Sequence, residues 1–180
     1  MHKPSKSEPG GFTVTEQTPP ATDGPPPGLT WGIKQSFMRY LGAIDDSSIG
    51  LGDGASLLEV GAFNFVFGSS AVDHATGSGT FDFRGTVEIS AHGGMLALNL
   101  RNPRVVVAAS GATLSVDDTS GNTADRLTLC TMEDGVYESL GSDLFWSATH
   151  VHLAKDGASV FGGQYAAGQQ LDPICWRITL

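Results

Sequence analysis

Charged side chains are scarce in this 180-residue chain, and basic ones are the scarcer kind. Lys and Arg number 10 against 19 Asp and Glu, which gives a formal net charge of −9 at pH 7. Binding of nucleic acid needs clustered basic residues at the phosphates, so this composition argues against a nucleic-acid partner. The chain also has no apolar run near 18 residues, the length that predicts a transmembrane segment. Its first residues contain no apolar core of a signal peptide.

Familiar catalytic and metal-binding motifs are missing as well. The sequence has no G-x-S-x-G elbow, no Walker loop, no H-E-x-x-H and no zinc-type cysteine spacing. His150-x-His152 would place two imidazoles on one face of a strand, but two ligands do not make a metal site. Cys130 and Cys175 form a disulfide bond if their strands are neighbours and stay two thiols if not, and both alternatives remain open. No carboxylate pair is marked by spacing, so we expect no enzyme.

Glycine, in contrast, is abundant at 24 residues, and proline is concentrated at one end. Seven of the nine prolines lie in residues 1–28, which hold little apolar surface to bury, so this segment is predicted to be a disordered leader. Residues 29–180 form the single predicted domain. Each interior glycine costs a helix about 1 kcal/mol relative to alanine, so the glycine content favours short strands joined by turns.

Apolar and polar residues alternate through much of the domain with the period of two that a β-strand requires. The fold class is therefore predicted to be mainly β, an antiparallel sandwich or a barrel-like sheet, with one N-terminal helix. The clearest candidate strands are residues 63–67, 81–89, 104–109, 112–116, 126–132, 144–153, 159–165 and 174–180.

The predicted helix spans Trp31–Leu41, with Thr30 as its N-cap and Gly42 as a left-handed C-terminal cap. Ser36 and Tyr40 are four residues apart, so they lie one above the other on a flank of this helix. A lone tyrosine at such a position is usually a packing residue with its hydroxyl in water.

One hairpin can be placed in register. Gly93-Gly94 suits a two-residue turn with positive φ at both positions. This turn pairs Ala91 with Leu96, Ile89 with Leu98 and Val87 with Leu100, so all six apolar side chains share one face. It also places His92 at the tip of the hairpin, on the face away from the core.

Four segments resemble the HtaA-type domain, the haem-binding module of actinobacterial haem-uptake proteins. Trp31-Gly-Ile-Lys-Gln-Ser-Phe-Met-Arg-Tyr40 is similar to the family's opening W-x-x-K-x-S-F-x-x-Y. Residues 85–96 resemble its G-x-V-x-F-x-x-H-x-G-x-L, residues 103–107 its following strand, and residues 157–173 its closing segment. Each piece is weak alone, but four in the right order span nearly the whole domain.

The resemblance implies that Tyr40 is the axial ligand of ferric haem b, with Ser36 one turn before it in the pocket. It implies that His92 supports the tyrosinate by hydrogen bonding or packing, with His150 and His152 as alternatives for that role. The helix would then carry the haem ligand. An anionic phenolate oxygen favours ferric iron, and tyrosine is among the residues that ligate haem.

The function expected from this resemblance is capture of ferric haem and its transfer to haemoproteins or downstream haem-receptor proteins in iron acquisition. The expected location is extracellular or at the cell surface. The alternative hypothesis is an adhesion or carbohydrate-binding β-sandwich, which predicts exposed aromatics such as Trp146 or Trp176 on a sheet face. A third hypothesis, an enzyme built on loop carboxylates, has no motif behind it.

Overall fold

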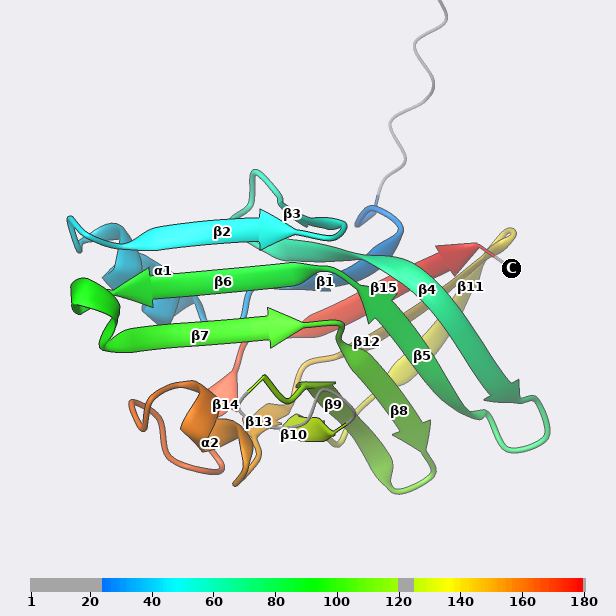
Figure 1. The fold of residues 1–180 in the computed structure, drawn as a ribbon. Helices are drawn as coiled ribbons and strands as arrows, with labels where there is room; N and C mark the ends of the chain where they lie inside the picture. The colour runs from blue at the N-terminus through cyan, green and yellow to red at the C-terminus, as the bar shows by residue number, and fades with distance from the viewer. Residues whose placement is uncertain (1–23, 120–124, 180) are drawn as a thin grey trace, which may run out of the picture.

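Two antiparallel sheets form the protein in the computed structural model, which describes residues 24–119 and 125–179. The larger sheet has twelve strands and curls strongly, and the smaller has three (Figure 1). The large sheet runs in the order β11 (Val136–Leu140), β12 (Asp143–Ala148), β15 (Ile174–Thr179), β1 (Gly28–Trp31), β4 (Phe63–Asp73), β5 (Ser78–Arg84), β8 (Arg104–Ala108), β9 (Gly111–Asp117), β10 (Arg126–Met132), β13 (Val151–Leu153) and β14 (Gln170–Leu171), with β3 (Ala55–Leu57) paired to β4.

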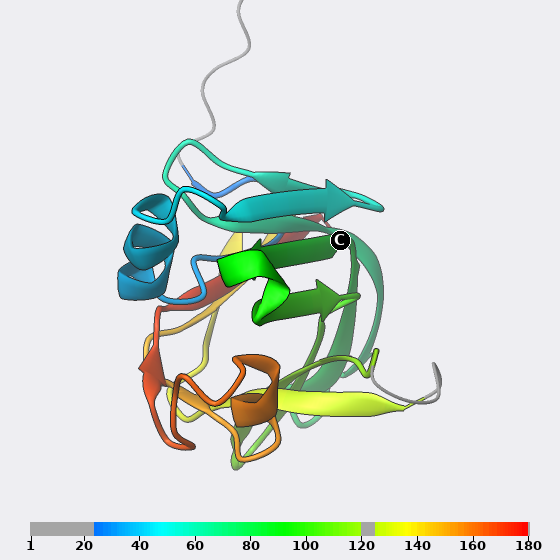
Figure 2. The same ribbon diagram turned by 60° about the vertical axis from the view of Figure 1, so that its left-hand side comes forward.

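The small sheet consists of β2 (Ser48–Gly52), β6 (Thr86–Ala91) and β7 (Leu96–Arg101), in the order β2-β6-β7. Three short helical elements complete the fold: α1 (Gln35–Gly42), the 3-10 turn η1 (His92–Gly94) and α2 (Gly157–Val160). Figure 2 shows α1 in blue and the green η1 side by side at one end of the molecule, with α2 in orange below them. The mainly β antiparallel fold predicted from the sequence is therefore confirmed.

The small sheet is continuous with the large one through a corner in two strands. β5 continues into β6 at Gly85, and β7 continues into β8 at Asn102 and Pro103. The Asn102 N–H donates to the Gly85 carbonyl at 2.9 Å, and both residues have positive φ, 47° and 144°. A Cβ at position 85 would lie 2.7 Å from the Ala55 nitrogen, so only glycine fits here. Strands that bend in this way can pass from one sheet to another.

The register of the β6–β7 hairpin is the one predicted. Ala91 pairs with Leu96, Ile89 with Leu98 and Val87 with Leu100, and Gly93 and Gly94 have φ of 63° and 90°. A slip by one residue would expose five Val, Ile and Leu side chains, each worth about 1.5–3 kcal/mol when buried. The six buried side chains of this face are Val87, Ile89, Ala91, Leu96, Leu98 and Leu100.

The predicted helix Trp31–Leu41 begins four residues too early. Trp31 belongs to β1, where it pairs with Ile174 and Phe63, and Leu29, Trp31 and Ile33 are buried with the period of a strand. The N-cap is Lys34, not Thr30. Gly42 does not form a left-handed cap either: it is the last residue of α1 and does not have a positive φ, and the last turn tightens to i→i+3 bonds.

Two further strand predictions are corrected. Residues 159–165 do not form a strand, since α2 and a turn with two left-handed glycines occupy this region. Residues 144–153 form two strands, β12 and β13, in different parts of the large sheet. Most of the predicted leader, residues 1–23, lies outside the described residues, and Gly28 already belongs to β1. Within the described ranges, no helix has the length and apolar character needed to cross a bilayer.

Candidate functional site

Helix α1 presents Ser36 and Tyr40 to solvent while it buries Phe37 and Leu41. Because Ser36 and Tyr40 are four residues apart, they share one flank of the helix, as the spacing predicted. The Tyr40 side chain keeps 44% of its surface exposed, which is unusual for a large aromatic residue beside a core. An external ligand can therefore reach this residue.

The first turn of α1 is anchored by the closing segment of the chain. Phe37, Phe161 and Tyr165 form a trio of edge-to-face rings with centroids 5.6–6.1 Å apart. The Lys34 ammonium donates to the Gln170 carbonyl at 2.9 Å and lies 5.9 Å from the Tyr165 ring centroid. These contacts fix the helix axis and hence the direction in which Tyr40 projects.

His92 lies at the tip of the β6–β7 hairpin, as predicted, and is exposed. Its own φ of 55° is in the left-handed region, which the glycine pair did not predict. Non-glycine residues are uncommon in this region and are held there only when their surroundings require it. The turn closes with a bond from the Met95 N–H to the His92 carbonyl at 3.2 Å.

The structure brings Tyr40 and His92 together across 52 positions of sequence. Tyr40 Oη and His92 Nε2 are 2.6 Å apart, and the ring centroids are 6.0 Å apart at an angle of 50°. In this hydrogen bond a neutral phenol donates to Nε2, or a protonated Nε2 donates to a phenolate. A phenol oxygen with an imidazole at this distance is a site that can hold an electrophilic cation and manage the proton that the phenol loses.

Asp46 is the neighbour of this pair that the sequence did not single out. Its carboxylate accepts the backbone N–H of His92 at 3.1 Å and that of Gly93 at 2.6 Å. These two bonds, Gly93 first, hold the pKa of Asp46 below its usual value, so the group is anionic at neutral pH. No local sequence pattern predicts this role of Asp46, because its hydrogen-bond partners are backbone N–H groups 46 and 47 positions away.

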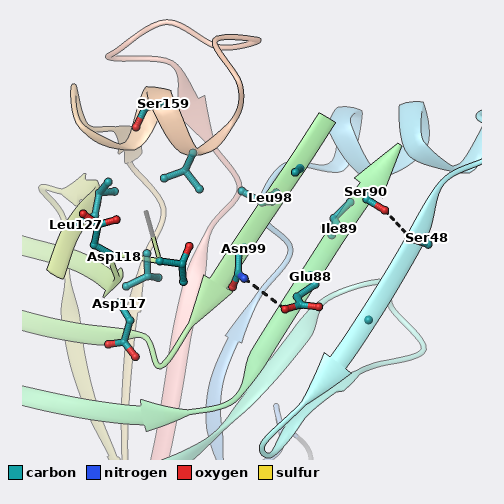
Figure 3. A pocket seen from close by; sticks show the side chains of 15 residues that line it. Ser48, Glu88, Ile89, Ser90, Leu98, Asn99, Asp117, Asp118, Leu127 and Ser159 are labelled. Atoms are coloured by element: carbon teal, nitrogen blue, oxygen red, sulfur yellow. Dashed lines mark hydrogen bonds between the residues drawn. The ribbon is translucent and has the colours of Figure 1, made fainter. Parts of the chain in front are cut away.

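A cavity of about 720 Å³ lies beside the site, between the small sheet and α2 (Figure 3). It begins two residues before His92, where the Ser48 and Ser90 hydroxyls are hydrogen bonded at 2.8 Å. Neither Tyr40 nor His92 lines it, so it adjoins the pair rather than enclosing it. Its size falls in the range of ligand pockets, roughly 300–1,000 Å³. Its wall mixes apolar and polar side chains, among them Leu98, Val116, Leu127, Val160, Glu88, Asn99 and Asp117.

The other two candidate histidines lie away from Tyr40. His150 hydrogen bonds to Asp134, with Nδ1 and Oδ2 2.9 Å apart, and His152 lies in β13 opposite Thr131 and Gln170. The structure thus pairs Tyr40 with His92 and not with either alternative. Among the described residues, no three His, Cys, Asp or Glu side chains converge as a metal site would require.

The cysteines do not form a disulfide bond. Cys130 in β10 and Cys175 in β15 are both free thiols, and their strands are not neighbours. Cys130 is fully buried, because a bulge between Thr128 and Cys130 shifts the register of β10 by one residue. Burial raises the pKa of the Cys130 thiol far above its usual range and that of Cys175 to about 11.

Comparison with known proteins points to one family. A family model described as Htaa matches residues 27–176. The fold is similar to the crystal structure of the C-terminal domain of HtaA from Corynebacterium glutamicum, with 28% identity, a TM-score of 0.72 and coverage of 84% of this chain and 94% of that one.

Two more crystal structures from Corynebacterium glutamicum are similar. The N-terminal domain of HtaA is 25% identical, with a TM-score of 0.61 and coverage of 84% of this chain and 95% of that one. The haem-binding protein HtaB is 19% identical, with a TM-score of 0.58 and coverage of 84% and 91%, which shows a common fold. No curated protein sequence was found to match this chain.

Proposed function

Because the chain belongs to the HtaA family, we propose that it captures ferric haem through Tyr40 and passes this cargo to another haem protein. The observation that carries the proposal is the 2.6 Å contact between Tyr40 Oη and His92 Nε2 on an exposed surface. The family resemblance implied this pair, with His150 and His152 as alternatives to His92. HtaB, which shares the fold, is itself a haem-binding protein.

The residues present fit haem in their donor chemistry. Ferric haem supplies an iron that accepts an anionic oxygen ligand, and tyrosine serves as such a ligand in other haem proteins. Tyr40 offers its oxygen from the end of an anchored helix, and 44% of its side chain is open to solvent. In this proposal the Ser36 hydroxyl, exposed one turn earlier on the same flank, lies beside the bound haem.

His92 has a defined task in this proposal. A tyrosine binds iron through its phenolate oxygen, so Tyr40 Oη must lose its proton when it becomes a ligand. His92 Nε2 is within hydrogen-bond distance and is placed to take that proton. The resulting N–H then donates to the phenolate oxygen and stabilises its charge. When the cargo leaves, the proton can return from Nε2 to Oη.

Transfer of the cargo follows from the same geometry. Tyr40 is one protein ligand on an exposed surface, so a recipient can approach without unfolding the site. The partners we propose are haemoproteins that supply haem and receptor proteins that take it, at the cell surface or outside the cell. Mixing the haem-loaded protein with an apo-haemoprotein should move the absorbance to the recipient, and retention of haem would contradict the transfer role.

The haem assignment is tested by titration of the protein with ferric haem. The wild type should give a Soret shift and a tyrosinate-to-iron charge-transfer band, and Tyr40→Phe should lose that band. Tyr137→Phe is the matched control, since the Tyr137 hydroxyl is buried with no hydrogen-bond partner among the described residues. A Tyr40→Phe spectrum identical to the wild type would contradict the proposal.

The carbohydrate-binding alternative loses its expected platform. Trp146 and Trp176 have no exposed surface, and their rings stack on each other inside the core with centroids 6.1 Å apart. The carboxylate of Asp117, which lines the cavity, is bound to Arg126 and Asn102 at 2.6 and 2.8 Å. The Asp117 carboxylate therefore has a structural role. Haem capture remains the function that the site supports best.

A further inference from the structure

The loop between α1 and β2 makes a second connection to the His92 turn. Asp46 lies six residues after Tyr40 in this loop, and each of its carboxylate oxygens accepts one backbone N–H of the turn. Oδ1 is 3.1 Å from the His92 nitrogen, and Oδ2 is 2.6 Å from the Gly93 nitrogen. The segment that bears Tyr40 is therefore held to the segment that bears His92 at two places.

The two N–H groups point the same way because of the backbone conformation. His92 and Gly93 are consecutive left-handed residues, with φ of 55° and 63°. Successive N–H groups in such turns form a concave site for an anion, and the Asp46 carboxylate fills it. The two hydrogen bonds from this anion help to offset the cost of a left-handed histidine at this position.

The contact with Asp46 also leaves the imidazole of His92 unused. Asp46 binds only backbone atoms of His92, so Nε2 is free to face Tyr40 Oη at 2.6 Å. Tyr40 and His92 are both exposed, and a hydrogen bond between two exposed side chains is a weak constraint by itself. A second, charge-assisted connection between the same segments restricts the relative motion that this bond would otherwise allow.

We propose that Asp46 is the positioning residue of the haem site: it clamps the His92 turn so that Nε2 faces Tyr40 Oη before haem arrives. This rests on the proposed function in that Tyr40 and His92 are taken as the haem site. Asp46 does not touch haem in this proposal and acts through His92. Its effect should be local, because the β2–β6 ladder starts with the Ser48 and Ser90 pair two residues further on and holds the sheet without it.

The test compares Asp46→Ala with Asp45→Ala, which removes the same charge from the adjacent exposed position. Haem dissociation into excess apo-haemoprotein should be roughly tenfold faster for Asp46→Ala, the low end of the effect that residues supporting a metal ligand have. Its charge-transfer band should shift or weaken, whereas Asp45→Ala should match the wild type. Asp46→Asn keeps one acceptor oxygen and should fall between the two.

A haem-free measurement separates this inference from the proposed function. In the apo wild type, the His92 Nε2 nitrogen shift should report a hydrogen bond to Tyr40, and the Gly93 amide should be protected from hydrogen exchange. Both signals should be lost in Asp46→Ala and kept in Asp45→Ala, with little change in melting temperature. If both persist in Asp46→Ala, the clamp is wrong even where haem binds; if both are lost but the wild type takes up no haem, the clamp stands and the haem function fails.

Discussion

Two exposed histidines of this protein each lie beside an aspartate, yet the two pairs are arranged for different outcomes. Asp134 binds the His150 backbone N–H at 3.0 Å and also its imidazole, with Nδ1 and Oδ2 2.9 Å apart. Asp46 binds the backbone at His92 and leaves the ring to Tyr40. The carboxylate therefore decides the role of each histidine: Asp134 hydrogen bonds to the ring of His150, whereas Asp46 hydrogen bonds only to backbone N–H groups and leaves the ring of His92 for Tyr40.

The two segments also differ in how tightly other atoms pack around them. The His92 turn is open, and a Cβ at Gly93 or Gly94 would meet nothing within 4 Å. The turn that bears Asp134 is packed, because a Cβ at Gly135 would lie 2.4 Å from the Trp146 ring. The segment that bears Asp134 is therefore held by packing against the core, whereas the His92 turn depends on its few hydrogen bonds.

The largest difference should come from replacing each of the two histidines by alanine in turn and comparing the haem affinities. His92→Ala removes the imidazole at Tyr40 Oη, and we expect haem affinity to fall about 10- to 100-fold, as for other partners of metal ligands. His150→Ala should leave the haem affinity unchanged. Competition titration with a second haem-binding protein measures the haem affinity of both variants. Equal losses in the two variants would show that His92 and His150 do not differ in their role toward haem.

The second prediction concerns the two glycines. Gly135→Ala forces a methyl group into the Trp146 ring and should lower the free energy of unfolding by about 1–3 kcal/mol, as overpacking does. In Gly93→Ala the new methyl group has no atom within 4 Å, so only the left-handed backbone is unfavourable for alanine, and the free energy of unfolding should fall by about 1 kcal/mol. Denaturant unfolding of both variants gives the two values, and a greater loss for Gly93→Ala would show that the His92 turn is the more tightly packed one.

The third prediction uses the pH dependence of Asp134. Partial burial raises its pKa, but hydrogen bonds from the Thr149 hydroxyl and from the backbone and ring of His150 outweigh this and hold the pKa well below its usual range. A group whose pKa is lowered by folding stabilises the fold above its unfolded pKa, near 4, and loses that contribution as the pH falls through the folded value.

Asp134→Asn should therefore be less stable than the wild type at pH 6 by about 1.5 kcal/mol, the low end of the scale for a hydrogen bond to a charged group, because Asp134 is partly exposed. The difference should shrink steadily below pH 4. Thermal melting across this range measures it, with Asp156→Asn, an exposed aspartate, as the control. A difference that does not depend on pH would mean that the charge of Asp134 is unimportant, and haem binding should not change in either variant.

The sequence predicts those features of the fold that depend on residues close together in the chain. It does not predict the features that depend on partners remote in sequence. The β6–β7 register followed from alternation and two glycines, because a hairpin is local. Trp31 was misplaced in the helix because Lys34 and Met38, three and seven residues after it, continue a helical spacing, while its true partners Phe63 and Ile174 are remote in sequence. The bulge that buries Cys130 leaves no mark on its own strand.

The candidate site divides in the same way. Ser36 and Tyr40 were placed on one flank of a helix by their spacing, and His92 at the hairpin tip by the glycine pair that follows it. That Tyr40 and His92 face each other came only from the family resemblance, since no local rule relates positions 52 apart. Asp46 was invisible because a carboxylate that binds backbone N–H groups needs no particular side chain opposite it.

A crystal structure of the protein with ferric haem bound tests the proposed site most directly. We predict iron bonded to Tyr40 Oη, with His92 Nε2 still within hydrogen-bond distance of that oxygen and Asp46 still bound to the His92 turn. Iron bonded to another residue, or haem seated away from α1 and the β6–β7 hairpin, would contradict it.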